Sequence, residues 1–151
     1  MVRNLTTDDV LPVINLLLKF HQESHQRILT MDTDKLVDML YNYINTAEAF
    51  FKVYDCGGKI KGFFSGTWDS LYSVEKLGFL SFFYIDPCYR NGKVSLSLVK
   101  ELALLQDEKD IKIMYATSTA GMGKVNQNSF TRLFKRVGFI DDYGCLTRIK
   151  K

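Results

Sequence analysis

The sequence predicts a single mixed α/β domain with a central mixed sheet flanked by helices. Apolar residues recur at spacings of three and four in some segments and of two in others, which indicates that helices and strands alternate along the chain. The 151 residues suffice for one ordinary domain, and their content of 46% hydrophobic and 25% charged residues is typical of a globular protein. The chain contains neither an internal repeat nor a linker-like stretch, so we expect one domain over residues 1–151.

The N-terminal part predicts a short strand followed by two helices. Val2 to Leu5 is the expected strand, and Thr6 or Thr7 with the acidic pair after it can cap the first helix. A second helix is expected from about Thr33 to Ala47, because its apolar residues recur at spacings of three and four. The stripe expected on the first helix consists of Val10, Ile14, Leu17, Leu18 and His21.

In the middle of the chain the apolar period changes to two. Phe50 to Tyr54 and Ile60 to Trp68 flank the turn sequence Asp-Cys-Gly-Gly, which tolerates positive φ, so an antiparallel hairpin is expected. Lys76 to Asp86 is rich in strand-forming residues and is ended by Pro87. This segment is therefore expected to be a third strand.

The C-terminal part predicts two more helices, each followed by a strand. The helices are expected at Val94 to Gln106 and at Gln127 to Val137, where Gly138 can end the second one. The strands are expected at Ile111 to Ala116 and at Tyr143 to Ile149. The predicted element order is therefore β-α-α-β-β-β-α-β-α-β.

Composition excludes several classes of function. A net charge of +3, from 20 basic and 17 acidic residues, is too balanced to predict a nucleic-acid or membrane-surface partner. No segment has the roughly 18 uninterrupted apolar residues that a membrane helix requires, and the first residues contain no apolar signal core. Cys56, Cys88 and Cys145 show neither CxxC spacing nor a nearby pair of histidines. We expect free thiols, no metal site and a cytoplasmic location.

The most informative segment is the loop between the expected strand at Lys76 to Asp86 and the helix expected from Val94. A short polar loop containing Arg90, Gly92 and Lys93 opens directly into this helix. The N–H groups at a helix start, together with the helix dipole, suit a phosphate or pyrophosphate. An ordinary strand-to-helix connection explains the same residues equally well.

Two segments resemble a known family. The stretch YIDPCYRNGKVSLSLV, from Tyr84 to Val99, is similar to the acyl-coenzyme A binding segment of the GCN5-related N-acetyltransferase (GNAT) family, whose loop pattern is Arg/Gln-x-x-Gly-x-Gly/Ala. Leu133 to Phe139 is similar to the helix ending with Gly-Phe in that family, and the expected element order resembles its fold along essentially the whole chain. The resemblance implies a GNAT-like acyl-CoA N-acyltransferase fold, with a central strand splayed from its neighbour to admit a pantetheine arm.

The resemblance also implies an activity. A protein of this family transfers an acetyl group from acetyl-CoA to an amine of a small molecule or protein, without a metal. The sequence leaves undecided whether the protein forms a homodimer. The acceptor would lie among the first-helix region, residues Asp69 to Glu75 and the C-terminal hairpin. The cofactor-binding residues that the resemblance implies are Tyr84, Ile85, Arg90, Asn91, Gly92, Lys93, Val94, Ser95 and Phe134.

Departures from the family pattern affect both binding and catalysis. Lys93 stands where the first motif glycine is usual, so it either crowds the phosphates or supplies a countercharge. The general-base glutamate usual on the central strand is absent from Phe79 to Ser81, and the usual thiolate-protonating tyrosine is replaced by Phe134. This absence motivates a second hypothesis, a catalytically inactive protein of the same fold that serves as a CoA-binding or interaction module.

Other side chains can replace the missing catalytic groups. Ser81 and Tyr115 are candidates because the resemblance places them beside the thioester, and His21 is a candidate because histidine is the natural base near neutral pH. For His21, packing in the core is the alternative, since it lies on the apolar stripe of the first helix.

Two motifs are better explained by structure than by function. Gly121 to Lys124 resembles a fragment of a phosphate-binding loop but lacks the GxxxxGK[ST] spacing, so an ordinary loop is expected. The aromatic runs at Phe50, Phe63 and Phe82 could stack on nucleic-acid bases. Few lysines accompany them, and we predict that they pack in the core of a two-sided sheet.

Overall fold

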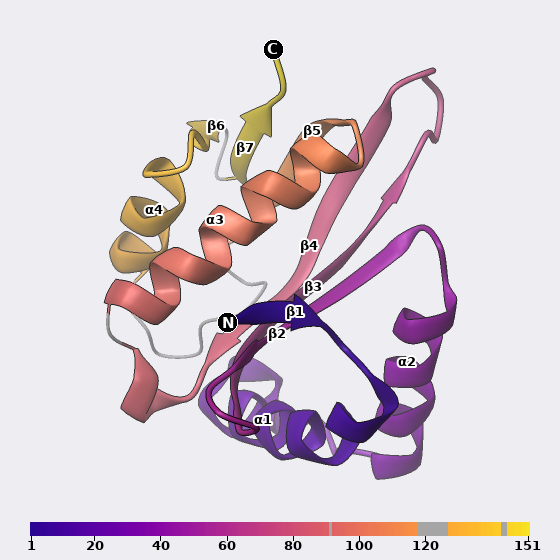
Figure 1. Ribbon diagram of the computed structural model, residues 1–151, viewed down its shortest axis with the longest axis vertical. Coiled ribbons are helices and arrows are strands. Elements are labelled where there is room, and N and C mark those ends of the chain that lie inside the picture. Colours follow the sequence, from indigo (N-terminus) through magenta and orange to yellow (C-terminus); the bar gives the residue numbers. More distant parts are fainter. Residues whose placement is uncertain (91, 118–126, 143–144) are drawn as a thin grey trace.

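A computed structural model of the chain describes residues 1–90, 92–117, 127–142 and 145–151 (Figure 1). The strands are β1 (Val2–Asn4), β2 (Ala49–Asp55), β3 (Ile60–Asp69), β4 (Lys76–Ile85), β5 (Ile111–Ala116), β6 (Ile140–Asp142) and β7 (Cys145–Ile149). The helices are α1 (Val10–Glu23), α2 (Thr33–Asn45), α3 (Gly92–Glu108) and α4 (Gln127–Lys135). Short 3₁₀ turns are η1 (Thr7–Asp9), η2 (His25–Ile28) and η3 (Pro87–Tyr89).

The strands form one seven-stranded sheet in the order β1-β2-β3-β4-β5-β7-β6. Neighbouring strands are antiparallel except β4 and β5, which run parallel and are joined through α3. Figure 1 shows α3 and α4 on one face of the sheet and α1 and α2 on the other. No helix in the described ranges is long and apolar enough to cross a membrane.

The predicted mixed α/β fold and its element order are confirmed, with one additional strand. The sequence predicts a single strand after the last helix, whereas the structure has β6 and β7 paired from Ile140 opposite Thr147 to Asp142 opposite Cys145. All residues of β6 are exposed, and the strand is too short to show a period of two. Its strand conformation therefore depends on pairing with β7, which the local sequence does not reveal. Tyr143, where the sequence places the start of the last strand, lies outside the described residues.

Each face of the sheet carries its own hydrophobic core, because alternate residues of a strand point to opposite faces. The core beneath α3 and α4 includes Phe64, Phe83 and Leu98. The core beneath α1 and α2 includes Phe63 and Leu17. Both core residues from β3 are completely buried, so the predicted packing of the aromatic runs in a two-sided core is confirmed there.

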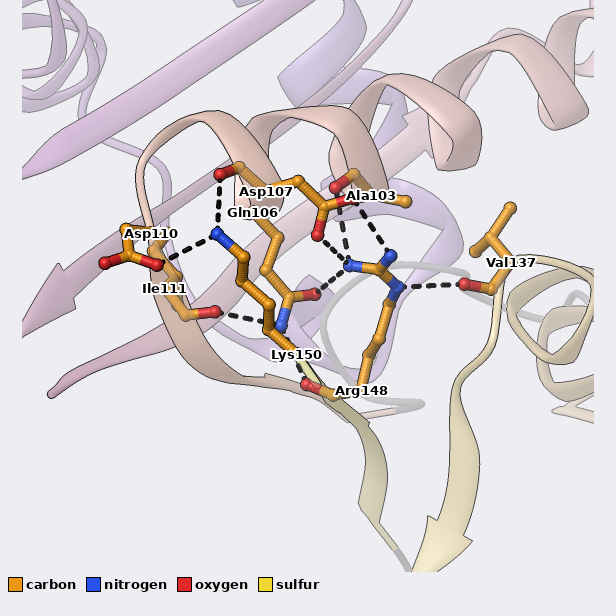
Figure 2. Close-up of polar contacts among 8 residues, drawn as sticks. All are labelled: Ala103, Gln106, Asp107, Asp110, Ile111, Val137, Arg148 and Lys150. Carbon is orange, nitrogen blue, oxygen red and sulfur yellow. Dashed lines mark hydrogen bonds and ion pairs between the residues drawn. The ribbon is translucent and has the colours of Figure 1, made fainter.

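A network of polar contacts fixes the end of the sheet to α3 (Figure 2). The buried Gln106 amide donates to the Ile111 carbonyl at 3.2 Å and the Arg148 carbonyl at 2.8 Å. The Arg148 guanidinium donates to Gln106 Oε1 and Asp107 Oδ1, both at 2.9 Å, and to the Val137 carbonyl at 3.0 Å. The hydrogen bond from Arg148 lowers the pKa of Asp107. The network therefore joins β5, β7 and the turn after α4 to one helix end.

Candidate functional site

Strand β4 is paired along nearly its whole length on one edge and along half of it on the other. It pairs with β3 from Leu77 to Ile85. Its pairing with β5 ends where Leu80 lies opposite Ala116, the last residue of β5. From Ser81 to Ile85 the second edge of β4 therefore pairs with no described strand. This is the splayed central strand that the sequence resemblance implies.

A β-bulge lies at the point where the two strands part. Ser65 of β3 pairs with Phe82 and Gly66 pairs with Leu80, so Ser81 is an extra residue in β4. A Cβ atom at Gly66 would lie 2.1 Å from the Phe79 carbonyl oxygen, so the close approach of the strands requires glycine at position 66. The bulge changes the direction of β4 beside its free edge.

The turn after β4 is held by Asp86. One carboxylate oxygen accepts a hydrogen bond from the Cys88 N–H at 3.2 Å, and the other lies 3.0 Å from Nζ of Lys19 in α1. Burial by itself raises the pKa of Asp86, but these hydrogen bonds outweigh it and hold the pKa below its usual range. The carboxylate therefore stays charged and fixes η3 against α1.

Arg90, next to this turn, faces the protein. Its Nε donates to the Ile85 carbonyl at 2.9 Å, and its Nη2 lies 2.5 Å from Glu23 Oε2 in the last turn of α1. The Tyr84 hydroxyl donates to Glu23 Oε1 at 2.7 Å, and the guanidinium lies 5.3 Å from the centre of the Tyr84 ring. Burial and the Glu23 carboxylate raise the pKa of Tyr84, so its hydroxyl remains protonated. Glu23 thus links α1 to both β4 and the loop before α3.

A cavity of about 330 Å³ lies between the first turn of α3 and one face of α4. Three of its side chains are guanidinium groups, of which that of Arg90 is paired with Glu23, and no carboxylate is present in its described lining. The N–H groups and the dipole at the start of α3 add to this positive potential. The cavity is therefore suited to a ligand with several phosphate groups. Its lining residues are Arg90, Gly92, Ser95, Ser129, Arg132, Leu133 and Arg136.

The residues expected to bind the cofactor separate into a lining group and a supporting group. Arg90, Gly92 and Ser95 line the cavity, and a Cβ atom at Gly92 would meet no atom within 4 Å. Lys93 is exposed at the start of α3. The side chains of Tyr84, Ile85, Val94 and Phe134 are buried in the two cores. Asn91 lies outside the described residues.

Ser81 and Tyr115 lie near the parting of the strands, and His21 lies in the last turn of α1. Ser81 is the bulged residue, and the half-buried Tyr115 stacks on Phe79 with ring centroids 5.4 Å apart. His21 is half-buried, and the ring of its neighbour Phe20 packs on β4. In the part of the chain that the structure describes, no hydrogen bond joins these three side chains.

Sequence reasoning missed Glu23, Ser129, Arg132 and Arg136. Arg132 lies on the polar side of α4 and Arg136 in the turn directly after the helix, and a spacing of four residues places two side chains on one face of a helix. That spacing is a signal the sequence does contain. Glu23 has no comparable signal, since its partner Arg90 is 67 residues away.

The motif from Gly121 to Lys124 lies outside the described residues. Cys56 and Cys88 are exposed, Cys145 is half-buried, and all are free thiols, as predicted. Among the described residues no group of three or more His, Cys, Asp or Glu side chains is arranged to hold a metal ion.

Solved structures of acetyltransferases resemble this chain over nearly its whole length. The ribosomal-protein-alanine N-acetyltransferase from Brucella melitensis gives a TM-score of 0.77 at 16% identity, over 99% of each chain. An acetyltransferase of the GNAT family from Streptococcus pneumoniae gives 0.72 at 14% identity, over 100% of this chain and 99% of that one. PaiA N-acetyltransferase from Thermoplasma acidophilum, in complex with coenzyme A, gives 0.69 at 15% identity, over 99% and 98%.

No family model matches the sequence, and no curated protein sequence matches it. The likeness is therefore one of three-dimensional structure. The chain has the fold of GNAT-family acetyltransferases, with the parted β4 and β5 and the helix that follows β4. The fold that the two sequence motifs imply is confirmed.

Proposed function

We propose that the protein is an N-acetyltransferase that moves the acetyl group of acetyl-CoA to an amine. One observation carries the proposal: a cavity with three arginines at the start of α3 lies at the end of a strand whose free edge leads away from it. The cavity suits the phosphates of the donor, and the free edge suits its pantetheine arm. The likeness to an acetyltransferase structure with coenzyme A bound supports this use of the cavity.

The donor would lie along β4. N–H groups in the first turn of α3 would donate to the pyrophosphate, while Arg132 and Arg136 would neutralise phosphate charge. From Ser81 to Ile85, at roughly 3.3 Å per residue, the free edge extends about 15 Å, which suits an extended pantetheine. The amide groups of that arm can pair with the strand as a neighbouring strand would. The thioester would then lie where β4 and β5 part.

The transfer itself would rely on positioning. The amine nitrogen attacks the thioester carbonyl carbon, the carbon–sulfur bond breaks, and the amine proton is lost as the thiolate leaves. Holding the two reactants together replaces a bimolecular encounter. Proton transfer adds about 10²- to 10⁴-fold where a side chain supplies it. Ser81 and Tyr115 are the polar side chains that we place at this point, with His21 as the proposed base.

A catalytically inactive CoA-binding protein is the second candidate. It is favoured by one observation, the absence of a carboxylate from Phe79 to Ser81 together with the burial of Phe134 in the aromatic core.

Free cysteines and an acetyl-CoA donor both agree with a reducing, intracellular compartment.

The test separates the two candidates. Calorimetry measures acetyl-CoA binding by the intact chain, and a thiol-release assay measures turnover with a panel of amines and peptides. The enzyme proposal expects binding and amine-dependent release of coenzyme A. Binding with release no faster than in buffer, across the whole panel, would leave the CoA-binding module in its place.

A further inference from the structure

The point at which β4 and β5 part is closed on one face of the sheet and open on the other. On the α3 and α4 side, Leu80, Met114 and Ala116 are all buried. On the opposite side, Phe79 is 38% exposed and Tyr115 is half-buried, because no described helix covers them. If the thioester lies there, as the proposed function requires, the acceptor must approach across Phe79 and Tyr115.

These two rings form a flat apolar surface. Phe79 and Tyr115 are paired across the parallel strands, and their rings lie nearly parallel at 17° with centroids 5.4 Å apart. Thr67 of β3 lies directly opposite Phe79 in the antiparallel register, and Ala49 of β2 lies opposite Thr67. Because paired residues share a face, this row runs from the two rings to the edge of α2.

The same row continues into a groove. A cavity of about 350 Å³ between α2 and the sheet includes Thr67 and Ala49 in its wall, together with Met39 and Tyr43 of the helix. Thr67 therefore belongs to the groove and also neighbours the exposed Phe79. A volume of this size is at the lower end for small-molecule sites, which span roughly 300–1,000 Å³.

Charge on this surface is confined to its rim. Lys35 and Asp38 stand at the helix side of the groove, and Asp69 lies two residues after Thr67 in β3, on the same face. The row from Ala49 to Tyr115 carries no charged side chain. A flat apolar centre with a charged rim matches a molecule with an apolar body and a single amine, and aromatic faces also attract a cation.

We infer that the acceptor is a small amine carried on an aromatic or branched aliphatic body, which lies on Phe79 and Tyr115 and extends into the α2 groove. This inference rests on the proposed acetyl transfer and names its substrate class. A hydrophilic amine or a polyamine would leave the apolar row in contact with water and gain nothing from it.

The test compares 2-phenylethylamine with 2-aminoethanol and spermidine as acceptors for acetyl-CoA. Filling an apolar site changes kcat/KM by about 10- to 200-fold, so we expect 2-phenylethylamine to exceed both by at least about ten-fold. Phe79→Ala should abolish this preference by raising KM. Tyr41→Ala, which removes a comparably exposed ring from α2 outside the groove lining, is the matched control and should retain the preference.

Two further measurements show whether a variant loses activity through misfolding or through loss of donor binding. Thermal melting and acetyl-CoA affinity show that each variant is folded and holds the donor. Saturation-transfer NMR of 2-phenylethylamine with the protein and coenzyme A measures acceptor binding without turnover, and Phe79→Ala should reduce the signal while Tyr41→Ala should not.

The outcomes of this test differ from those of the proposed function. Equal or better use of spermidine, 2-aminoethanol or a peptide amine overturns the substrate class while the transferase proposal stands. If no amine is acetylated, the transferase proposal fails. If, in addition, 2-phenylethylamine gives no saturation-transfer signal with the unmodified protein, the inferred surface is overturned as well. A signal that Phe79→Ala abolishes would support the surface even then.

Discussion

At the scale of single residues, Glu23 does the most to connect separate parts of the site. Its two carboxylate oxygens accept hydrogen bonds from Arg90 and from the buried Tyr84 hydroxyl. Lys19, one turn earlier on α1, makes the neighbouring contact with Asp86. Two residues on one helix face therefore hold both ends of the loop that enters the proposed donor site.

Replacing Glu23 by alanine is expected to destabilise the protein by about 1–3 kcal/mol, because it leaves the buried Tyr84 hydroxyl without an acceptor and Arg90 without its carboxylate. Chemical denaturation measures the free energy of unfolding. Glu23→Gln, which keeps an acceptor for Tyr84, should lose less. Glu48→Ala, at an exposed position, is the control and should change little. A Glu23→Ala variant as stable as this control would show that the contact is unimportant.

Asp9 provides a prediction about pH. Hydrogen bonds from Arg3 lower the pKa of this buried carboxyl to about 2, outweighing the effect of burial. A carboxyl whose pKa is lower in the folded state contributes stability above its unfolded pKa and loses it as pH falls through the folded value. Asp9→Asn should therefore cost about 2 kcal/mol at pH 7. Denaturation curves should show the two proteins converging toward pH 2, and a gap of unchanged size at that pH would contradict this.

At the scale of elements, α4 divides its faces between two tasks. Phe130 and Phe134 enter the core, while Arg132 lines the cavity together with Arg136 of the turn after the helix. Reversing the charge of either arginine should weaken acetyl-CoA binding at least about ten-fold, because hydrogen bonds to charged groups contribute about 1.5–3 kcal/mol. Lys135→Glu makes the same charge change on the same helix outside the cavity lining. Calorimetry should find a smaller loss for Lys135→Glu, and equal losses would mean that only net charge matters.

Sequence patterns predict elements better than they predict their ends or their long-range contacts. The period of two over Ile60 to Trp68 predicts β3 within one residue, since such alternation is typical of a strand. Strand β6 has no such pattern, because all its residues are exposed. The free edge of β4 depends on where β5 stops, and the contact between Glu23 and Arg90 depends on tertiary packing, so neither follows from local periodicity.

At the scale of the whole molecule, the sheet separates the two halves of the proposed reaction. The donor cavity is built on the α3 and α4 side, and the open aromatic row faces the side of α1 and α2. Strand β4 belongs to both, because its free edge leads from one to the other. The proposed reaction would thus have separate approaches for its two substrates, which would meet where the strands part.

A calorimetric titration of the protein with acetyl-CoA tests the central claim most directly. The cavity beside α3 predicts saturable binding of one acetyl-CoA per chain, competition by free coenzyme A, and affinity that falls as salt is added, since arginines line this cavity and would attract the phosphates. No detectable binding at millimolar acetyl-CoA would contradict the assignment of this cavity and, with it, the proposed acetyl transfer.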